Sequence, residues 1–459
     1  VDVSVTRGQT TVVAGQRYTY FNPGSRSGGT WGGSIQGAVN VSVYSRGGSP
    51  VQGAFVMLST NPDSTYKGQT DANGLVTLSG PDVYGEQTIT ATAPGYSSAT
   101  VQHVNAENIT IFLSPPPSQG PPPPGPPTAT FEGKLTGLNK VATPGPNEFH
   151  MAVVFATKKS PWSRSPDTGN GNVLMSDGPY KLTTRIGDLA IVAVGGLYNS
   201  DTQELTPLMM GVKRYQFAAE GKTYKRDINL DIPLNSKLRF KLKNPPHGPD
   251  GPDYNRVTPW LDFGFEGVFG QLTFAEGTSS IVTADHLAGL TGKLSDVQYM
   301  AIGGSYTKNA NGNPGIPQSV VIKRKIKKTN QLVDMPKMVG IADIITPGPG
   351  ERPRNNLISW KLNTSNQPDF YFVQILTPMN RSVWDAFVPG SATSVRLPNF
   401  PDFSHLPPMK RPVPYPGGTY QLQVIGIRHP GASFGNFSYS DLSIDKWEAY
   451  SASGHVIQF

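Results

Sequence analysis

Charged residues are the first candidates for a chemical or binding role, and the densest run of charge is the stretch VVIKRKIKK at 320–328. Such a cluster could hold an acidic polymer or a phosphate backbone. The same residues could instead form an edge strand on which lysine blocks unwanted strand addition, and we favour this second interpretation. Aromatic side chains that would stack on bases are missing from the run, so no nucleic-acid partner is expected. Its basic residues are Lys323, Arg324, Lys325, Lys327 and Lys328.

Pairs of carboxylates are the next candidates, because glycoside hydrolysis needs two of them roughly 5 to 9.5 Å apart across a cleft. Asp227 and Asp231 share one face of an expected strand, and Asp262 and Glu266 lie close together in the sequence. No nucleophile-elbow, phosphate-loop or H-E-x-x-H motif accompanies them. The sequence therefore predicts a protein that is not an enzyme.

Metal and cofactor chemistry has little support in the sequence. Cysteine is absent, which excludes thiolate zinc sites, iron–sulfur clusters and thiol catalysis. No two of the seven histidines are spaced as local metal ligands. The loop HGPDGPDYN offers Asp250, Asp253 and Asn255 as oxygen ligands for calcium, but a Pro/Gly linker with solubilising acids is the favoured interpretation. No metal or cofactor is predicted.

Tryptophans are further candidates, because an exposed aromatic ring can serve as a platform for a sugar or anchor one domain on the next. Trp31, Trp162 and Trp384 lie in or near loop-like sequence. Trp162 belongs to the long loop 158–179 and is the predicted glycan platform. The remaining tryptophans lie in strand-like sequence and are expected in cores: Trp260, Trp360 and Trp447.

The elements that must position these residues are strands. The chain has 459 residues, of which 51 are Gly and 43 are Pro, and only 15% are charged. Many turn formers together with many Val, Thr, Tyr and Phe residues are typical of an all-β chain with long loops. Short strands recur about every ten residues with turn signals between them, a spacing typical of β-sandwiches. The net charge of +7 is mild for this length and permits, without requiring, attraction to acidic polymers.

Residues 1–34 form a leading segment of their own. Val1, Val3 and Val5 alternate with polar residues, and Tyr18 and Tyr20 do the same. Thirty residues cannot bury a core alone, so these strands must pair with the following domain or with another molecule. We therefore predict an assembly segment that can donate a strand. A first residue other than Met is expected where a signal peptide has been removed or where the sequence is a fragment.

The next segment, 35–114, carries the most specific pattern. A strand PVQGAFVML is followed by TDANGLVTL, then GEQTITATAPGYSSATV, then a closing ITIFL. In the turn TDANG, Asp71 can accept bonds from backbone amides ahead of it, and Asn73 and Gly74 tolerate positive φ. A capped hairpin is favoured over a calcium loop. Over about 37–113 the pattern resembles the carboxypeptidase regulatory-like (transthyretin-like) module, which implies a β-sandwich and no particular activity.

Three Pro/Gly-rich joints divide the rest of the chain. The first, a polyproline linker at 115–128, could hold two bodies about 40 Å apart. It is followed by predicted sandwiches at 129–244, 245–345 and 346–459. The stretch at about 130–242 loosely resembles the transthyretin-like pattern. The last domain resembles fibronectin type III modules at about 357–459, and this resemblance implies that Trp360 and Tyr420 are core residues.

Together these observations predict a non-catalytic structural or adhesive protein, secreted or displayed on a bacterial cell surface, whose leading strands could assemble copies into a filament. The expected partners are copies of itself or other surface proteins, with polysaccharide as a further candidate. No run of eighteen apolar residues is present, so no transmembrane helix is predicted. The alternatives are a carbohydrate-binding or accessory segment of a secreted hydrolase, and an enzyme whose site forms across the two middle domains.

Overall fold

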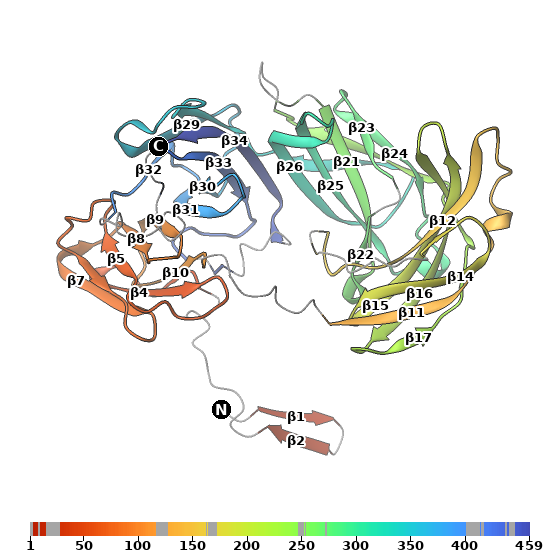
Figure 1. The fold of residues 1–459 in the computed structure, drawn as a ribbon, viewed down its shortest axis with the longest axis horizontal. Coiled ribbons are helices and arrows are strands. Elements are labelled where there is room, and N and C mark those ends of the chain that lie inside the picture. Colours follow the sequence, from red (N-terminus) through yellow and green to blue (C-terminus); the bar gives the residue numbers. More distant parts are fainter. Residues whose placement is uncertain are drawn as a thin grey trace. The chain divides into compact units, whose positions relative to one another are not determined.

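The protein is all-β, as predicted, and consists of several β-sandwiches (Figure 1). A computed structural model describes residues 28–115, 127–161, 163, 172–246, 252, 254–270, 273–400, 414, 417–436, 438–439 and 446–459, and the backbone of 3–7 and 10–14. The described chain divides into two compact units. Unit 1 holds residues 1–117, 342–447 and 452–459, and unit 2 holds 118–341 and 448–451. The only helices in the described part of the chain are four 3-10 turns of three residues: η1 (Leu138–Lys140), η2 (Gly264–Glu266), η3 (Gly292–Leu294) and η4 (Arg354–Asn356).

The first sandwich of unit 1 packs two sheets around one apolar core that runs from Ile35 to Leu113. The TDANG turn is a capped hairpin, as predicted: Asp71 Oδ1 accepts the backbone N–H groups of Asn73 and Leu75 at 2.8 and 2.9 Å, and Gly74 has φ +76°. One sheet has the order β3 (Thr30–Trp31), β10 (Asn108–Leu113), β4 (Gln36–Ser45), β7 (Leu75–Tyr84). The other has the order β6 (Lys67–Gln69), β5 (Phe55–Leu58), β8 (Gln87–Thr92), β9 (Ser98–Val104).

The second sandwich of unit 1 is built from the end of the chain around a separate core. Trp360 and Tyr420 are buried in it, as predicted. Trp384, expected near a loop, is also fully buried. One sheet is β28 (Ala342–Thr346), β29 (Leu357–Leu362), β32 (Ser394–Arg396). The facing sheet is β31 (Ser382–Pro389), β30 (Phe370–Leu376), β33 (Thr419–Arg428), β34 (Ala449–Gln458).

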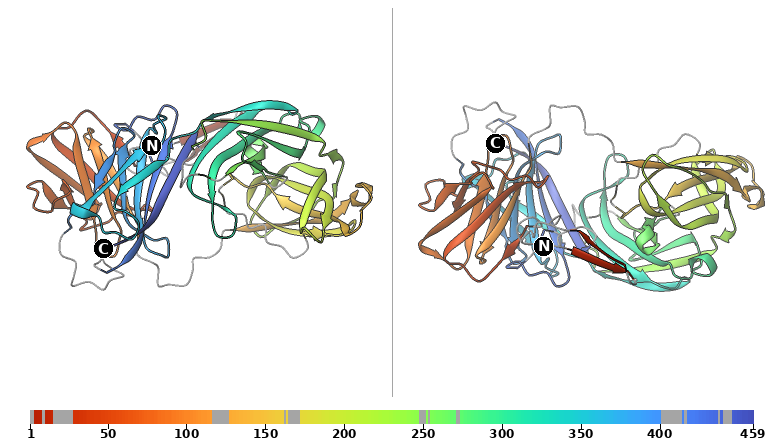
Figure 2. Two further views of the ribbon diagram at one scale, coloured as in Figure 1. Left: turned by 90° about the horizontal axis from the view of Figure 1, so that it is seen from above. Right: turned by 90° about the horizontal axis from the view of Figure 1, so that it is seen from below.

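The two sandwiches of unit 1 are joined through their strands, although they lie at opposite ends of the sequence. β9 and β31 pair in parallel, with Ser98 opposite Trp384 and Val101 opposite Phe387. Figure 2 shows the orange strands of the first sandwich beside the blue strands of the last. The Trp384 indole N–H also donates to Thr100 Oγ1 at 3.0 Å. The first and last modules therefore share one continuous sheet, a pairing that sequence patterns did not predict.

Unit 2 contains a sandwich whose core includes Phe131, Tyr180, Leu182 and Ile191. Its first sheet has the order β14 (Gly178–Arg185), β11 (Thr128–Thr136), β17 (Thr223–Lys225), and β18 (Ile228–Asn229) also pairs with β11. Its second sheet has the order β13 (Val173–Leu174), β12 (Glu148–Ala156), β15 (Gly187–Asn199), β16 (Glu204–Ala218), β19 (Ile232–Pro233).

Unit 2 has a second apolar core, which shares strand β15 with the sandwich just described. Strand β15 places Leu189, Ile191 and Ala193 in one core and the alternate residues Ala190 and Val192 in the other. This burial of both faces explains its unbroken apolar run LAIVAV. The second core lies between two sets of strands. These are β24 (Ile281–Leu287), β20 (Ser236–Lys243), β27 (Gln331–Lys337) on one side, and β22 (Val268–Phe269), β21 (Tyr254–Asp262), β25 (Gln298–Lys308), β26 (Pro314–Ile326), with β23 (Ala275–Gly277) paired to β21, on the other.

Strand pairing crosses the boundary predicted at 244/245 between the two middle domains. β20 precedes that boundary, yet it pairs with β24 and β27, which follow it. The Pro/Gly composition of the joint indicated a linker, but the strand before the joint completes the sheet after it. Nothing in a local pattern distinguishes a strand that joins the domain behind it from one that joins the domain ahead.

The leading segment forms a hairpin in which β1 (Val3–Arg7) pairs antiparallel with β2 (Thr10–Ala14). Val3 lies opposite Ala14, and Val5 lies opposite Val12. Among the described strands, β1 and β2 pair only with each other. The other predicted assembly residues, Val1, Tyr18 and Tyr20, lie outside the described residues, as do Trp162 and residues 116–126 of the polyproline linker.

Candidate functional site

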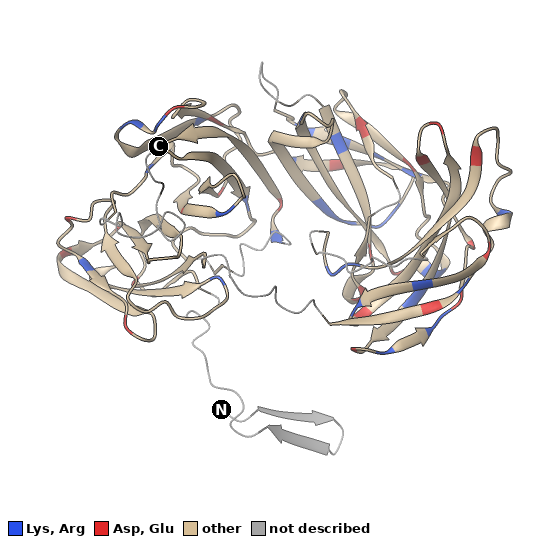
Figure 3. Ribbon diagram, in the orientation of Figure 1, with Lys and Arg blue, Asp and Glu red and all other residues tan. Residues whose placement is uncertain are grey.

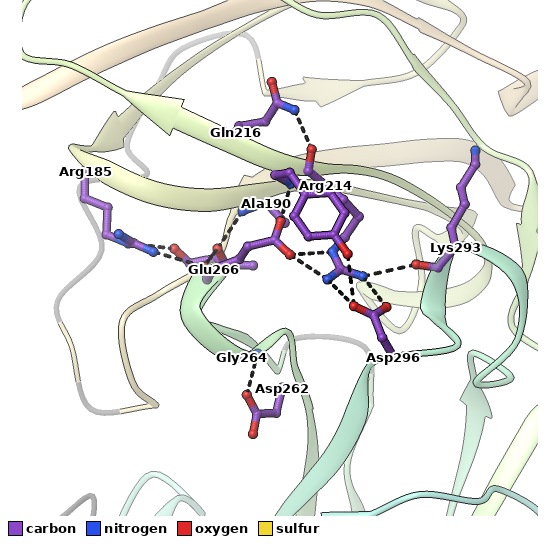
Figure 4. A network of polar contacts seen from close by, with 11 residues as sticks. Arg185, Ala190, Arg214, Gln216, Asp262, Gly264, Glu266, Lys293 and Asp296 are labelled. Atoms are coloured by element: carbon purple, nitrogen blue, oxygen red, sulfur yellow. Dashed lines mark hydrogen bonds and ion pairs between the residues drawn. The ribbon is translucent and has the colours of Figure 1, made fainter. Parts of the chain in front are cut away.

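The most developed polar site of the described chain is centred on an ion pair in unit 2 (Figure 4). Glu266, in the turn η2, has a fully buried side chain, and that of Arg214 on β16 is 9% exposed. Two guanidinium nitrogens, Nε and Nη2, each lie 2.6 Å from Glu266 Oε2. A buried charge must be paired to be tolerated, so each of these side chains depends on the other.

The ion pair lies at an irregularity of the β15–β16 ladder. Leu189 pairs with Gln216 and Ile191 with Lys213, so that Arg214 and Tyr215 together oppose a single residue. Tyr215 adopts the left-handed conformation, φ +58°, which is uncommon outside glycine and costs free energy for an aromatic residue. Its backbone N–H donates to Glu266 Oε1. The buried carboxylate thus binds both residues of the bulge and stabilises its strained backbone.

Asp296, just after η3, binds the outer side of the same guanidinium. Its two oxygens accept bonds from Arg214 Nη1 and Nη2 at 2.9 and 3.0 Å, and its Oδ2 accepts the Tyr215 hydroxyl at 3.1 Å. The bond from Arg214 is the main reason that the pKa of Asp296 falls to about 2, and the Tyr215 hydroxyl adds to the effect. Arg214 therefore bridges a buried and an exposed carboxylate.

The carboxylates of this region form ion pairs and hydrogen bonds with neighbouring residues of the described chain. Glu266 and Asp296 are both bonded to Arg214, and Asp262 Oδ1 accepts the backbone N–H of Gly264 at 2.9 Å, which shapes the turn into η2. The predicted pair Asp262 and Glu266 is thus engaged in two different local roles. Asp231, from the other predicted pair, forms an ion pair with Lys293 at 2.6 Å. Among the described residues, no group of three His, Asp or Glu side chains could hold a metal ion.

Exposed aromatic rings surround this network, and sequence reasoning missed them. Tyr215, Phe217 and Phe265 are 62%, 64% and 69% exposed, and the ring centroids of Tyr215 and Phe265 are 6.2 Å apart. A contiguous patch of exposed apolar rings can serve as a contact surface, whereas single exposed rings are common on proteins. The available signal was the alternation RYQF in β16, which favours a strand with Tyr215 and Phe217 on one side, but the side facing solvent could not be inferred.

The predicted basic run lies at the end of β26 and in the turn that precedes β27. Lys325 has φ +61° at a bulge opposite β25. The favoured edge-strand interpretation is wrong at Ile322, whose N–H donates to Glu448 O at 2.8 Å, while β25 pairs along the other side of β26. The lysines beyond Ile326 are exposed in the turn. The run is therefore the end of a paired strand followed by an exposed basic turn.

Comparison with known proteins supports one module. Residues 38–111 match the model of the carboxypeptidase regulatory-like domain, in agreement with the resemblance found at about 37–113. No curated protein matches the chain. No helix among the described residues is long and apolar enough to cross a membrane.

Similar solved structures share little beyond strands. A leucine-rich repeat protein from Bacteroides thetaiotaomicron has 14% identity and a TM-score of 0.17, covering 45% of this chain and 25% of its own. A streptococcal ancillary pilin has 9% identity and a TM-score of 0.15, covering 66% and 98%. The FN1–FN3 domains of chicken CNTN1 have 10% identity and a TM-score of 0.14, covering 61% and 83%. The chain thus spans about a quarter of the first protein, and no functional argument rests on these likenesses.

Proposed function

We propose that this protein is a non-catalytic structural or adhesive component, secreted or displayed on a bacterial cell surface. The observation that carries the proposal is the parallel pairing of β9 with β31, which fuses the first and last modules into one sheet. Arg46 and the buried Asp385 reinforce the joint with an ion pair of 2.9 Å. Separating the modules requires the rupture of the hydrogen bonds between these two strands, so the joint suits a scaffold that must withstand mechanical force.

Self-assembly through the leading hairpin is the finer part of the proposal. An isolated two-stranded hairpin is marginally stable in water, and its outer edges carry backbone groups that can pair with another chain. The hairpin β1–β2 pairs with no other described strand. Addition of such a strand to a neighbouring copy is β-augmentation, and head-to-tail repetition without closure yields a filament. Other cell-surface proteins could accept the same strand.

The test is the oligomeric state of the full chain and of two variants at one position. Val5→Pro removes a backbone N–H and disrupts β1, whereas Val5→Ile keeps the strand and serves as the matched control. We expect filaments by negative-stain electron microscopy for the native chain and for Val5→Ile, and monomers for Val5→Pro. A native chain that stays monodisperse at high concentration would refute assembly, as would filaments that form equally well with Val5→Pro.

Carbohydrate binding is the second candidate, and the exposed pair Tyr215 and Phe265 favours it over a purely structural role. Trp162 remains a predicted glycan platform. An array of neutral glycans separates the candidates: Tyr215→Ala should abolish binding, while Tyr84→Ala, which removes a similarly exposed ring at 58%, should not. Absence of retention by the native chain would dismiss this alternative.

A further inference from the structure

Strand β20 presents an unbroken row of positive charge to solvent. Its sequence, SKLRFKLK, alternates buried and outward residues along its length. Ser236, Leu238, Phe240 and Leu242 are buried, and all but Ser236 belong to the core of unit 2. Because the side-chain period of a strand is two, the basic residues lie on the opposite face. They are Lys237, Arg239, Lys241 and Lys243, of which the first three are exposed.

The two flanking strands leave this row largely unneutralised. Arg239 lies between Thr283 on β24 and Leu332 on β27, neither of which bears a charge. Lys241 lies opposite Asp334, but that carboxylate pairs with Lys243 at 3.5 Å. Asp285 is the other exposed acid of this face. Lys237, Arg239 and Lys241 form no ion pair with any described residue.

Further basic residues extend the row at both ends. The Asn330 N–H donates to the Lys237 carbonyl at 2.7 Å, and the Lys237 N–H donates to Asn330 Oδ1 at 3.0 Å. These bonds fix the exposed turn that holds Lys327 and Lys328 beside the start of β20. At the other end, Lys337 on β27 lies opposite Lys243. Figure 3 colours lysine and arginine blue on several strands of unit 2.

We propose that the outer face of β24–β20–β27 binds a linear anionic polysaccharide along β20. Alternate residues of a strand are about 7 Å apart, so the four basic side chains line a track of about 20 Å that follows an extended polymer with regularly spaced carboxylates or sulfates. β24, β20 and β27 contain no Trp or Tyr, and their one Phe, Phe240, is buried, so the stacking platform of a single-strand nucleic-acid binder is missing. Leu332, 47% exposed, is the large apolar side chain on this face. One such side chain offers too little apolar surface for insertion into a membrane.

The test is binding of the full chain to heparin and to polygalacturonate, measured over a series of salt concentrations. The variant Lys237→Gln/Arg239→Gln/Lys241→Gln removes three charges from the row. The control Lys140→Gln/Lys159→Gln/Lys222→Gln removes three exposed charges elsewhere in unit 2. We expect the row variant to bind at least tenfold more weakly and to lower the salt slope by about one per lost contact, while the control binds like the native chain.

Three results would overturn the inference. They are no binding of either polymer by the native chain near 0.1 M salt, equal losses in both variants, and tighter binding of duplex DNA or anionic vesicles than of the two polysaccharides. The substituted side chains are exposed, so thermal unfolding should not change in either variant. The inference supplies a ligand for the adhesive role but does not depend on the hairpin. Val5→Pro must therefore still bind the polymers, and a failure of assembly stays distinguishable from a failure of binding.

Discussion

The buried carboxylate of Glu266 allows a sharp prediction about stability. Glu266→Gln keeps the shape of the side chain and an oxygen for the Tyr215 N–H, but removes the negative charge that faces Arg214 at 2.6 Å. Removing one partner of a buried ion pair costs about 3 to 5 kcal/mol. Arg214 retains Asp296 on its outer side, so we expect the low end, about 3 kcal/mol.

A matched variant separates the effect of removing a buried charge from the effect of removing an exposed one. Asp296→Asn removes the other carboxylate of the same guanidinium, but that side chain is 55% exposed. Exposed ion pairs contribute about 0 to 1 kcal/mol, so this variant should lose less than about 1 kcal/mol. Glu266→Ala should lose more than Glu266→Gln, because the part-buried Tyr215 N–H then lacks its acceptor, at a further cost of about 1 kcal/mol.

The assay must report on unit 2, because two units with separate cores need not unfold together. Urea denaturation combined with hydrogen exchange of peptides from β16 would give the local free energy of opening. The structural explanation of the bulge is refuted if Glu266→Gln and Asp296→Asn destabilise equally, or if exchange around Tyr215 is unchanged by Glu266→Gln.

Two further predictions concern other contacts. The lowered pKa of Asp296 means that its contribution to stability is complete above the unfolded value near 4 and is lost as the pH falls through about 2. The stability difference between native chain and Asp296→Asn should therefore be constant above pH 5 and shrink below pH 4, as measured by denaturation at each pH; a constant difference down to pH 2 would contradict it. At the module joint, Trp384→Phe removes the bond to the buried Thr100 hydroxyl, which keeps Thr90 Oγ1 as a partner at 3.2 Å, and leaves a cavity where the larger ring packed. Together these losses should cost about 2 kcal/mol. Thermal unfolding measures this loss, and an unchanged melting temperature would show that the joint does not depend on that bond.

Local patterns predicted the parts of the fold that local physics determines. The turn at Asp71 follows from the side chain's ability to cap its own hairpin, and the burial of Trp360 and Tyr420 agrees with what the resemblance to fibronectin type III modules implied. The family match at 38–111 covers the segment that contains this turn. Within this module the order of strands and turns was therefore accessible from the sequence.

Pairings between distant segments were not accessible. Nothing near Ser98 or Trp384 indicates that their strands meet, because every strand offers the same backbone hydrogen-bonding groups. The bulge at Tyr215 depends on Glu266, which is 51 residues away. A resemblance of 357–459 to fibronectin type III modules and of 130–242 to the transthyretin-like pattern remains a prediction.

The pairing of β9 with β31 also means that β9 is synthesised long before its partner strand. Trp384 follows Thr100 by 284 residues, so at about 5 to 20 residues per second the ribosome needs roughly 15 to 60 seconds to deliver the partner strand. During that interval β9 is a bare sheet edge on a module that is otherwise complete. The nascent chain therefore exposes an edge that the finished chain covers, and truncated chains that end within unit 2 should be prone to aggregate.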